Sequence, residues 1–118
     1  YADTDQREKE LSTYSKMMSI FSDDPSALNS YAWRMAEIET NLEDALEKAR
    51  KAVVLTTDDP NRQAGIIDTE AEVLWKMGRF DEAIEAIERA LAIEPENQYF
   101  KDQKEKFIET KKTTPQSA

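Results

Sequence analysis

Two short segments of nearly the same sequence, each typical of a turn, divide this chain and set the length of the segment between them. Ser22-Asp23-Asp24-Pro25 recurs 35 residues later as Thr57-Asp58-Asp59-Pro60. An aspartate directly before a proline is typical of a helix start, because its carboxylate can accept hydrogen bonds from free amide groups and proline fits the first helical position. Asp24 and Asp59 are therefore expected to be N-caps. A third turn is predicted at Glu94-Pro95-Glu96-Asn97.

Apolar residues between these turns recur every three and four positions, which is the period of an α-helix. Asn41 is expected to cap one of the helices at its start and Gly78 to end another. No alternating stretch indicates a strand, and the short connections predict antiparallel hairpins, so the fold class is all-α. The six predicted helices lie near residues 5–22, 25–39, 42–55, 60–77, 80–93 and 96–111.

Composition excludes several classes of function. The 118 residues carry a net charge of −9, and since residues 96–118 carry +1, the first 95 hold −10. Nucleic acids and anionic membrane surfaces are disfavoured by that charge, whereas a basic or neutral polypeptide partner stays open. There is no histidine and no cysteine, so we expect no catalytic residue, no metal and no cofactor, and hence no enzyme.

The compartment stays open between cytoplasm and periplasm, because many proteins of oxidising compartments also lack cysteine. No apolar run reaches the length of a membrane span, so we expect a soluble protein. The chain begins with Tyr1 rather than methionine. We therefore expect a processed protein or a domain cut from a longer one.

Alanines recur at a spacing that indicates a repeated two-helix unit. Ala45 and Ala83 stand 38 residues apart, and Ala32 and Ala71 stand 39 apart. A two-helix unit at this spacing is the signature of an array of helical hairpins. Small side chains let two helix backbones approach closely, so these four alanines are expected at helix–helix contacts.

With these positions aligned, the chain resembles the tetratricopeptide-repeat family over residues 25–97. The stretch Gly78-Arg79-Phe80-Asp81-Glu82-Ala83-Ile84 matches the family's favoured turn between helices. Thr57 stands where the first unit should have proline. The family pattern is filled in the second unit by Ile67, Glu70, Ala71, Leu74, Ala83, Ile87 and Pro95, and in the first by Leu28, Tyr31, Ala32, Met35, Ala45 and Ala49.

The resemblance implies a right-handed α-α superhelix of stacked hairpins in one domain, residues 1–112. Its parts would be a flanking helix at 5–22, repeats at 25–57 and 60–94, a capping helix at 96–111, and a disordered tail at 113–118.

This sequence departs from the family pattern at three points. The first unit has one extra residue before Leu42, and the second gains about four near Asn61–Ala64, which would lengthen a helix by one turn. Glu70 occupies a slot where leucine is usual. It is either a buried carboxylate with a raised pKa or, in the simpler interpretation, reaches solvent or a cation such as Arg50.

In that family the first helix of each hairpin lines a concave groove that binds peptides, so the resemblance implies a protein-interaction scaffold. Trp33 and Trp75 either grip a peptide or pack half-buried between units. Glu72 and Lys76 either line the groove or simply pair with each other. The family's cationic clamp for a terminal carboxylate is absent, so a partner ending in acidic residues is not expected. The six predicted groove residues are Asn29, Trp33, Asp68, Glu72, Trp75 and Lys76.

Two alternatives stay open at this point. The phrases Asn29-Ser30-Tyr31-Ala32-Trp33, Asn41-Leu42-Glu43-Asp44-Ala45-Leu46 and Asp68-Thr69-Glu70-Ala71-Glu72-Val73 also resemble the C-terminal helical region of some bacterial thioredoxin-fold proteins. That resemblance implies an accessory domain of a larger oxidoreductase, with its catalytic cysteines elsewhere. The other alternative is a homo-oligomer that forms through an exposed apolar face of an end helix, which would use Tyr14, Met17 and Met18 or Tyr99 and Phe100.

Overall fold

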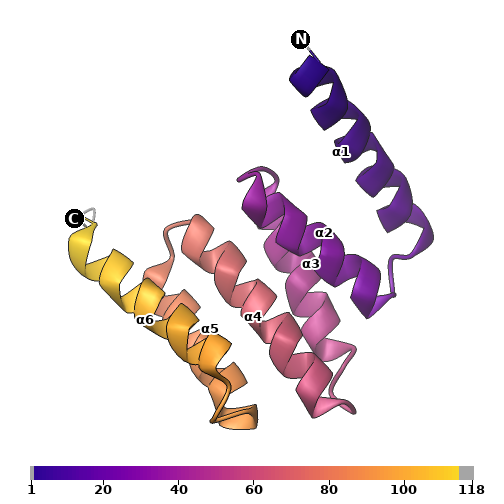
Figure 1. Cartoon of the computed structure of the whole chain (residues 1–118). Coiled ribbons are helices and arrows are strands. Elements are labelled where there is room, and N and C mark those ends of the chain that lie inside the picture. The colour runs from indigo at the N-terminus through magenta and orange to yellow at the C-terminus, as the bar shows by residue number, and fades with distance from the viewer. Residues whose placement is uncertain (1, 115–118) are drawn as a thin grey trace.

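The computed structural model describes residues 2–114, and within them the backbone is helical throughout apart from short turns, with no strand (Figure 1). The all-α stack of hairpins predicted from the sequence is therefore confirmed. The six helices are α1 (Ala2–Ile20), α2 (Pro25–Glu37), α3 (Leu42–Val54), α4 (Pro60–Lys76), α5 (Phe80–Ile93) and α6 (Gln98–Thr113).

The two aspartates before proline cap helices as predicted. The Asp24 carboxylate accepts hydrogen bonds from the backbone amides of Ser26 and Ala27 at 2.9 and 3.3 Å, and α2 begins at Pro25. Asp59 accepts one from the amide of Arg62 at 3.4 Å. Each cap satisfies amides that a helix leaves unpaired in its first turn.

Asn41 stands at the N-cap of α3, as predicted, and its carbonyl accepts from the amide of Ala45 at 2.8 Å, but its side chain does not take part. Asn41 adopts left-handed backbone angles with φ of 50°, and its side chain makes no capping hydrogen bond. Glu39 has a similar φ of 51°. The extra residue before Leu42 forces a tight reversal between α2 and α3, and asparagine is used there because it tolerates left-handed geometry.

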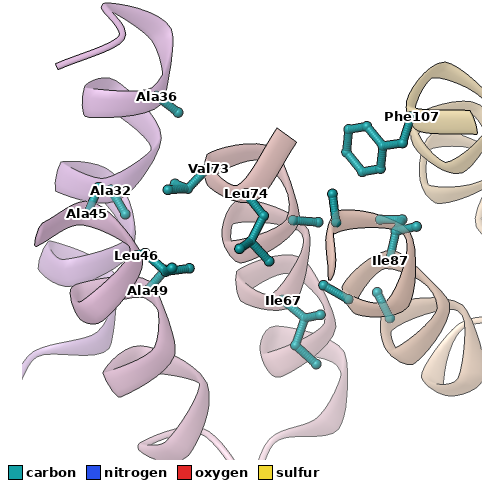
Figure 2. Packing of buried hydrophobic residues seen from close by; sticks show 14 of the residues in the cluster. Ala32, Ala36, Ala45, Leu46, Ala49, Ile67, Val73, Leu74, Ile87 and Phe107 are labelled. Atoms are coloured by element: carbon teal, nitrogen blue, oxygen red, sulfur yellow. The ribbon is translucent and has the colours of Figure 1, made fainter. Parts of the chain in front are cut away.

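Buried alanines allow the helices of the two hairpins to pack closely. Ala32, Ala45, Ala71 and Ala83 are fully buried, as predicted. Figure 2 shows Ala32 and Ala45 in the packed core. α2 pairs with α3, α4 pairs with α5, and α4 also packs against both helices of the first hairpin. α6 then packs on α5, where Phe107 completes the core. The core is thus continuous from the first hairpin to α6.

In the second hairpin, the longer first helix and the glycine that follows it agree with the sequence analysis. α4 has 17 residues against 13 in α2, so the additional residues extend the helix by about one turn. Gly78 follows α4 with φ of +79°, a conformation that glycine adopts without steric cost.

The first helix stands apart from the rest of the stack (Figure 1). α1 contacts α2 much less extensively than α3 contacts α4. Tyr14 and Met17 of α1 stand 35 residues before Ala49 and Ala52 of α3, so bulky side chains replace alanines at those two positions. Bulky residues at these positions are consistent with the less extensive contact. The contact includes an edge-on ring pair between Tyr14 and Tyr31 at 5.8 Å and an ion pair in which Arg34 of α2 donates to both carboxylate oxygens of Glu10, at 2.8 and 3.2 Å.

The last helix runs further than predicted. α6 continues through Thr113, and residues 115–118 of the predicted tail lie outside the described residues. Phe100, offered above as an exposed apolar residue, is buried. Among residues 2–114 no helix has the length and apolar character needed to cross a membrane. The division into flanking helix, repeats and cap stays a prediction.

Candidate functional site

The six predicted groove residues lie on two helices that pack against each other, and the surface of α2 and α4 that carries them is called the inner face below. Asn29 and Trp33 belong to α2, and Asp68, Glu72, Trp75 and Lys76 belong to α4. Asn29 and Asp68 are 39 residues apart, as are Trp33 and Glu72, so each pair occupies one position of the repeated hairpin. The two tryptophans are not equivalent, because the counterpart of Trp75 on α2 is Ala36.

Asp68 and Glu72 are covered by α6. The side-chain amide of Gln103 donates hydrogen bonds to Asp68 Oδ1 and Glu72 Oε1, both at 3.1 Å. The Lys106 ammonium adds an ion pair to Glu72 at 3.2 Å. Asp68 is 5% exposed and Glu72 is 9% exposed. These two carboxylates therefore serve first to dock α6 on the inner face of α4.

The burial of these carboxylates changes their acidity. Removal from water raises the pKa of Asp68 to about 6, and the neighbouring charge of Glu72 raises it further, against the opposing effects of Gln103 and Lys106. The pKa of Tyr99, a half-exposed residue at the start of α6, is raised to about 12 by partial removal of its hydroxyl from water and by the charges of Asp68 and Glu72. Asp68 and Tyr99 therefore release their protons at a higher pH than exposed aspartate and tyrosine side chains do.

Trp75 is half-buried between the stack and α6. Its ring packs against Phe107 at 5.9 Å between centroids, and the Lys106 and Lys76 ammonium groups lie 4.1 and 5.1 Å from its ring. Glu72 takes its ion pair from Lys106 and not from Lys76 among the described residues. Trp75 Nε1 is buried without a hydrogen-bond acceptor in residues 2–114. The side chain borders a shallow pocket of about 210 Å³ lined also by Glu39, Lys76, Gly78, Phe80 and Thr110.

Asn29 and Trp33 lie on the part of the inner face that α6 does not cover. Both residues are partly exposed. The Asn29 Oδ1 atom is nevertheless buried, and no donor in the described part of the chain reaches it. A buried acceptor without a partner is uncommon in folded proteins and calls for an explanation.

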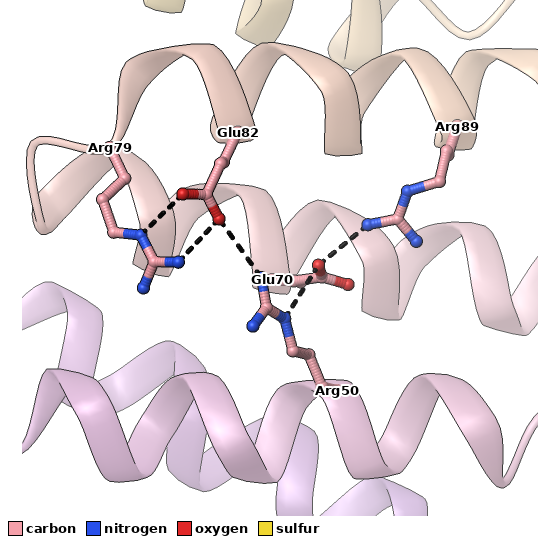
Figure 3. Close-up of polar contacts among 5 residues, drawn as sticks. All are labelled: Arg50, Glu70, Arg79, Glu82 and Arg89. Carbon is pink, nitrogen blue, oxygen red and sulfur yellow. Dashed lines mark hydrogen bonds and ion pairs between the residues drawn. The ribbon is translucent and has the colours of Figure 1, made fainter.

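Glu70 forms a separate cluster that ties three helices together (Figure 3). It is 3% exposed and accepts from Arg50 of α3 at 3.4 Å and from Arg89 of α5 at 2.8 Å. Arg50 continues to Glu82, which is also bound by Arg79. The predicted partner Arg50 is confirmed, whereas the sequence analysis did not name Arg89, the second partner of Glu70. The cluster is a structural tie between the two hairpins.

The comparisons with known proteins decide what the second hairpin is. A family model described as tetratricopeptide repeat matches residues 65–97. Residues 65–97 are a tetratricopeptide repeat. The repeat takes in most of α4, all of α5 and the turn before α6. Asp68, Glu72, Trp75 and Lys76 therefore lie on the first helix of the repeat, as the residue pattern predicts.

A curated relative extends the likeness beyond this tetratricopeptide repeat. The "Protein STIP1 homolog" of Dictyostelium discoideum is 39% identical over 82 residues, which is 67% of this chain. The chain matches only 14% of the length of that relative. No solved structure matches at a comparable level.

The weaker resemblance to thioredoxin-fold proteins stays a prediction. Residues 4–114 bring no three acidic side chains together in a way that could hold a metal ion. Sequence reasoning missed Gln103 and Lys106, although a glutamine and a lysine at helical spacing on an end helix could have indicated a contact with acidic residues.

Proposed function

We propose that this chain is a non-catalytic scaffold that holds an extended or helical segment of a partner protein against the inner face of α2 and α4. The tetratricopeptide repeat at residues 65–97 and the segment shared with the STIP1 homolog support a role in protein–protein interaction. The inner face is the part of the fold that would make the contact.

One observation carries the detailed form of this proposal. The Asn29 Oδ1 atom is buried without a donor, beside the partly exposed Trp33 one helical turn further on α2. Burying an acceptor unpaired costs about 1–3 kcal/mol, which a peptide N–H would recover. The proposal requires this partly exposed side chain to rotate so that a peptide N–H reaches the atom. Asn29 would then fix the register of a bound backbone while Trp33 covers an apolar side chain.

Trp75 extends the same site toward α6. Its Nε1 group is a buried donor without an acceptor among the described residues, and a peptide carbonyl is an acceptor of the right kind. Lys76 lies beside the ring and would contact the rim of the ligand. Asp68 and Glu72 are occupied by α6, so the proposed contact surface consists mainly of Asn29, Trp33, Trp75 and Lys76.

The charge of the site indicates the class of partner. Acidic or apolar residues stand at Asp68, Glu72 and Trp33, where the family's carboxylate-binding grooves use lysine or arginine. Because α6 occupies Asp68 and Glu72 and the clamp cations are absent, a neutral segment fits better than one ending in acidic residues. A groove made by two hairpins is small, so micromolar affinity is expected, about −8 kcal/mol.

The test begins with capture of a partner by the intact protein, followed by titration of purified variants. Asn29→Ala and Trp33→Ala are each expected to weaken binding by at least about fivefold, because each removes one proposed contact. Asn61→Ala, at an exposed asparagine in the first turn of α4, is the matched control and should bind as the parent does. Circular dichroism verifies the fold of each variant. Parental affinity in folded Asn29→Ala and Trp33→Ala would remove the groove from the proposal.

A further inference from the structure

Exposed apolar side chains gather at one end of the stack. Ile20 and Val54 are 70% and 69% exposed, and Phe21 and Leu55 are 49% and 40% exposed. Among the described residues, only Tyr99 joins these four as a large exposed hydrophobic residue. Isolated exposed apolar residues are ordinary, whereas several gathered on one surface mark a place of contact.

Two independent contacts hold the ends of α1 and α3 near each other. Lys51, in the last turn of α3, forms an ion pair at 2.8 Å with Asp23, two residues after Phe21. Met18 of α1 and Val53 of α3 both pack against the small core cluster around Leu28. The α1–α2 and α3–α4 turns accordingly lie at the same end of the molecule (Figure 1). The four exposed residues, Ile20, Phe21, Val54 and Leu55, are called the end patch below.

Carboxylates follow the end patch in both turns. Both turns carry the Asp-Asp-Pro phrase, which places Asp23 and Asp24 after Phe21 and Asp58 and Asp59 after Leu55. The capping bonds of Asp24 and Asp59 keep those two carboxylates in place. Of the nearby cations, Lys51 pairs with Asp23, whereas Arg62 donates to the neutral Ser26 hydroxyl at 2.6 Å and keeps its charge. The four aspartates of the two turns therefore outnumber these two cations.

We infer that the end patch is a docking surface for a basic amphipathic segment of a partner protein. Apolar residues of such a segment would bury Ile20 and Val54, while its lysines or arginines would face the aspartates of the two turns. The net charge of −9 would speed the approach of a cationic partner. The same charge repels a second copy of this chain and anionic lipid. This surface lies outside the inner groove, so the inference does not depend on the proposed function.

The test uses the full chain and a labelled synthetic helix of leucine and lysine in amphipathic order, with its leucine–glutamate counterpart as the second probe. Fluorescence anisotropy at low salt should show micromolar binding of the lysine peptide only, about 10⁻⁵ M. Ile20→Ser with Val54→Ser should weaken binding at least about fivefold, because both anchors are lost. Asp23→Asn with Asp58→Asn should weaken it similarly and reduce its dependence on salt.

Matched variants separate the end patch from general attraction of opposite charges. Tyr99→Ser removes an exposed hydrophobic residue elsewhere, and Glu85→Gln with Glu105→Gln removes two exposed charges from α5 and α6. Both should bind within about twofold of the parent. Trp33→Ala, which tests the groove, should also leave the affinity for this peptide unchanged. Equal weakening in the matched variants would show non-specific attraction and overturn the inference.

A measurement on the unsubstituted protein protects the test against misfolding. In amide spectra the lysine peptide should shift signals of residues 18–24 and 51–59 more than those of α5 and α6. Shifts confined to other helices would overturn the inference, as would equal binding of the glutamate peptide. Sedimentation of the parent across a concentration series provides the remaining check, because self-association lost in Ile20→Ser with Val54→Ser would show that a second copy occupies the patch.

Discussion

Asp68 and Glu70 are buried carboxylates on the same helix, α4, and they have hydrogen-bond partners of different charge. Glu70 is held between the guanidinium groups of Arg50 and Arg89. Asp68 receives its direct hydrogen bond from the neutral amide of Gln103. An amide offsets the loss of hydration less well than a cation does, so the pKa of Asp68 is raised to about 6. Ionised Asp68 therefore opposes folding at neutral pH.

The pH dependence of stability should reveal this residue. The pKa of Asp68 is higher in the folded chain, about 6, than its ordinary value of 3.8. Its favourable contribution is therefore complete below the ordinary value and is lost as pH rises through 6. Asp68→Asn has no such charge, so the unfolding free energy of the parent should fall relative to this variant by about 2–3 kcal/mol between pH 4 and 7. Urea unfolding at a series of pH values measures the difference, and a constant difference would contradict the prediction.

The chain's two glycines have opposite roles, because Gly65 lies within α4 and Gly78 lies in the turn that follows it. Gly65 lies in the second turn of α4, where an added Cβ would meet nothing within 4 Å. Gly78 also has open space, but its φ of +79° is strained for any residue with a side chain. Space is therefore equal at the two sites, and backbone conformation alone distinguishes them.

Alanine substitution should change stability in opposite directions at these glycines. Gly65→Ala is expected to raise the unfolding free energy by about 0.5–1 kcal/mol, since alanine favours the helix. Gly78→Ala should lower it by about 1 kcal/mol or more, because alanine must adopt left-handed angles. Chemical denaturation of both variants under one condition is the measurement. A stabilising Gly78→Ala would show that the turn can change conformation.

Local rules explain how far the sequence could predict these elements. The caps at Asp24 and Asp59, the left-handed Gly78 and the buried alanines follow from short-range chemistry, and the structure confirms them. Asn41 occupies the predicted N-cap of α3, but the sequence could not show that its side chain makes no capping bond, because side-chain capping and left-handed turns both favour asparagine.

The candidate site was less predictable because its contacts join distant parts of the chain. Gln103 reaches Asp68 over 35 residues and Glu72 over 31, so no local pattern links them. The groove assignment, taken from the repeat pattern, placed both carboxylates on the inner face of α4 but could not show that α6 covers them. The end patch was missed because helical periodicity does not indicate that the C-terminal ends of α1 and α3 lie near each other.

At the scale of the whole molecule, packing is uneven along the stack. The second hairpin is enclosed by neighbours on both sides, whereas α1 contacts little beyond α2. In arrays of this kind each unit is stabilised mainly by its nearest neighbours. Opening should therefore start at the α1 end and reach α4 last.

Amide hydrogen exchange should show this gradient directly. Amides in the middle of α1 are expected to exchange at least about 100-fold faster than those in the middle of α4, because opening α1 exposes little buried surface. α6, which is fixed by Gln103, Lys106 and Phe107, should be intermediate and serves as the comparison within the same protein. Equal protection in α1 and α4 would show that the chain opens as one unit.

The docking of α6 on Asp68 and Glu72 has a consequence for ligand detection. A molecule that claims either carboxylate must first displace Gln103, so its binding and the release of α6 are linked, and each weakens or strengthens the other to the same degree. Binding of such a ligand would weaken the packing of α6, whereas a ligand that binds only to α2 would leave α6 in place. The mobility of α6 would thus distinguish a ligand bound at Asp68 or Glu72 of α4 from one bound on α2.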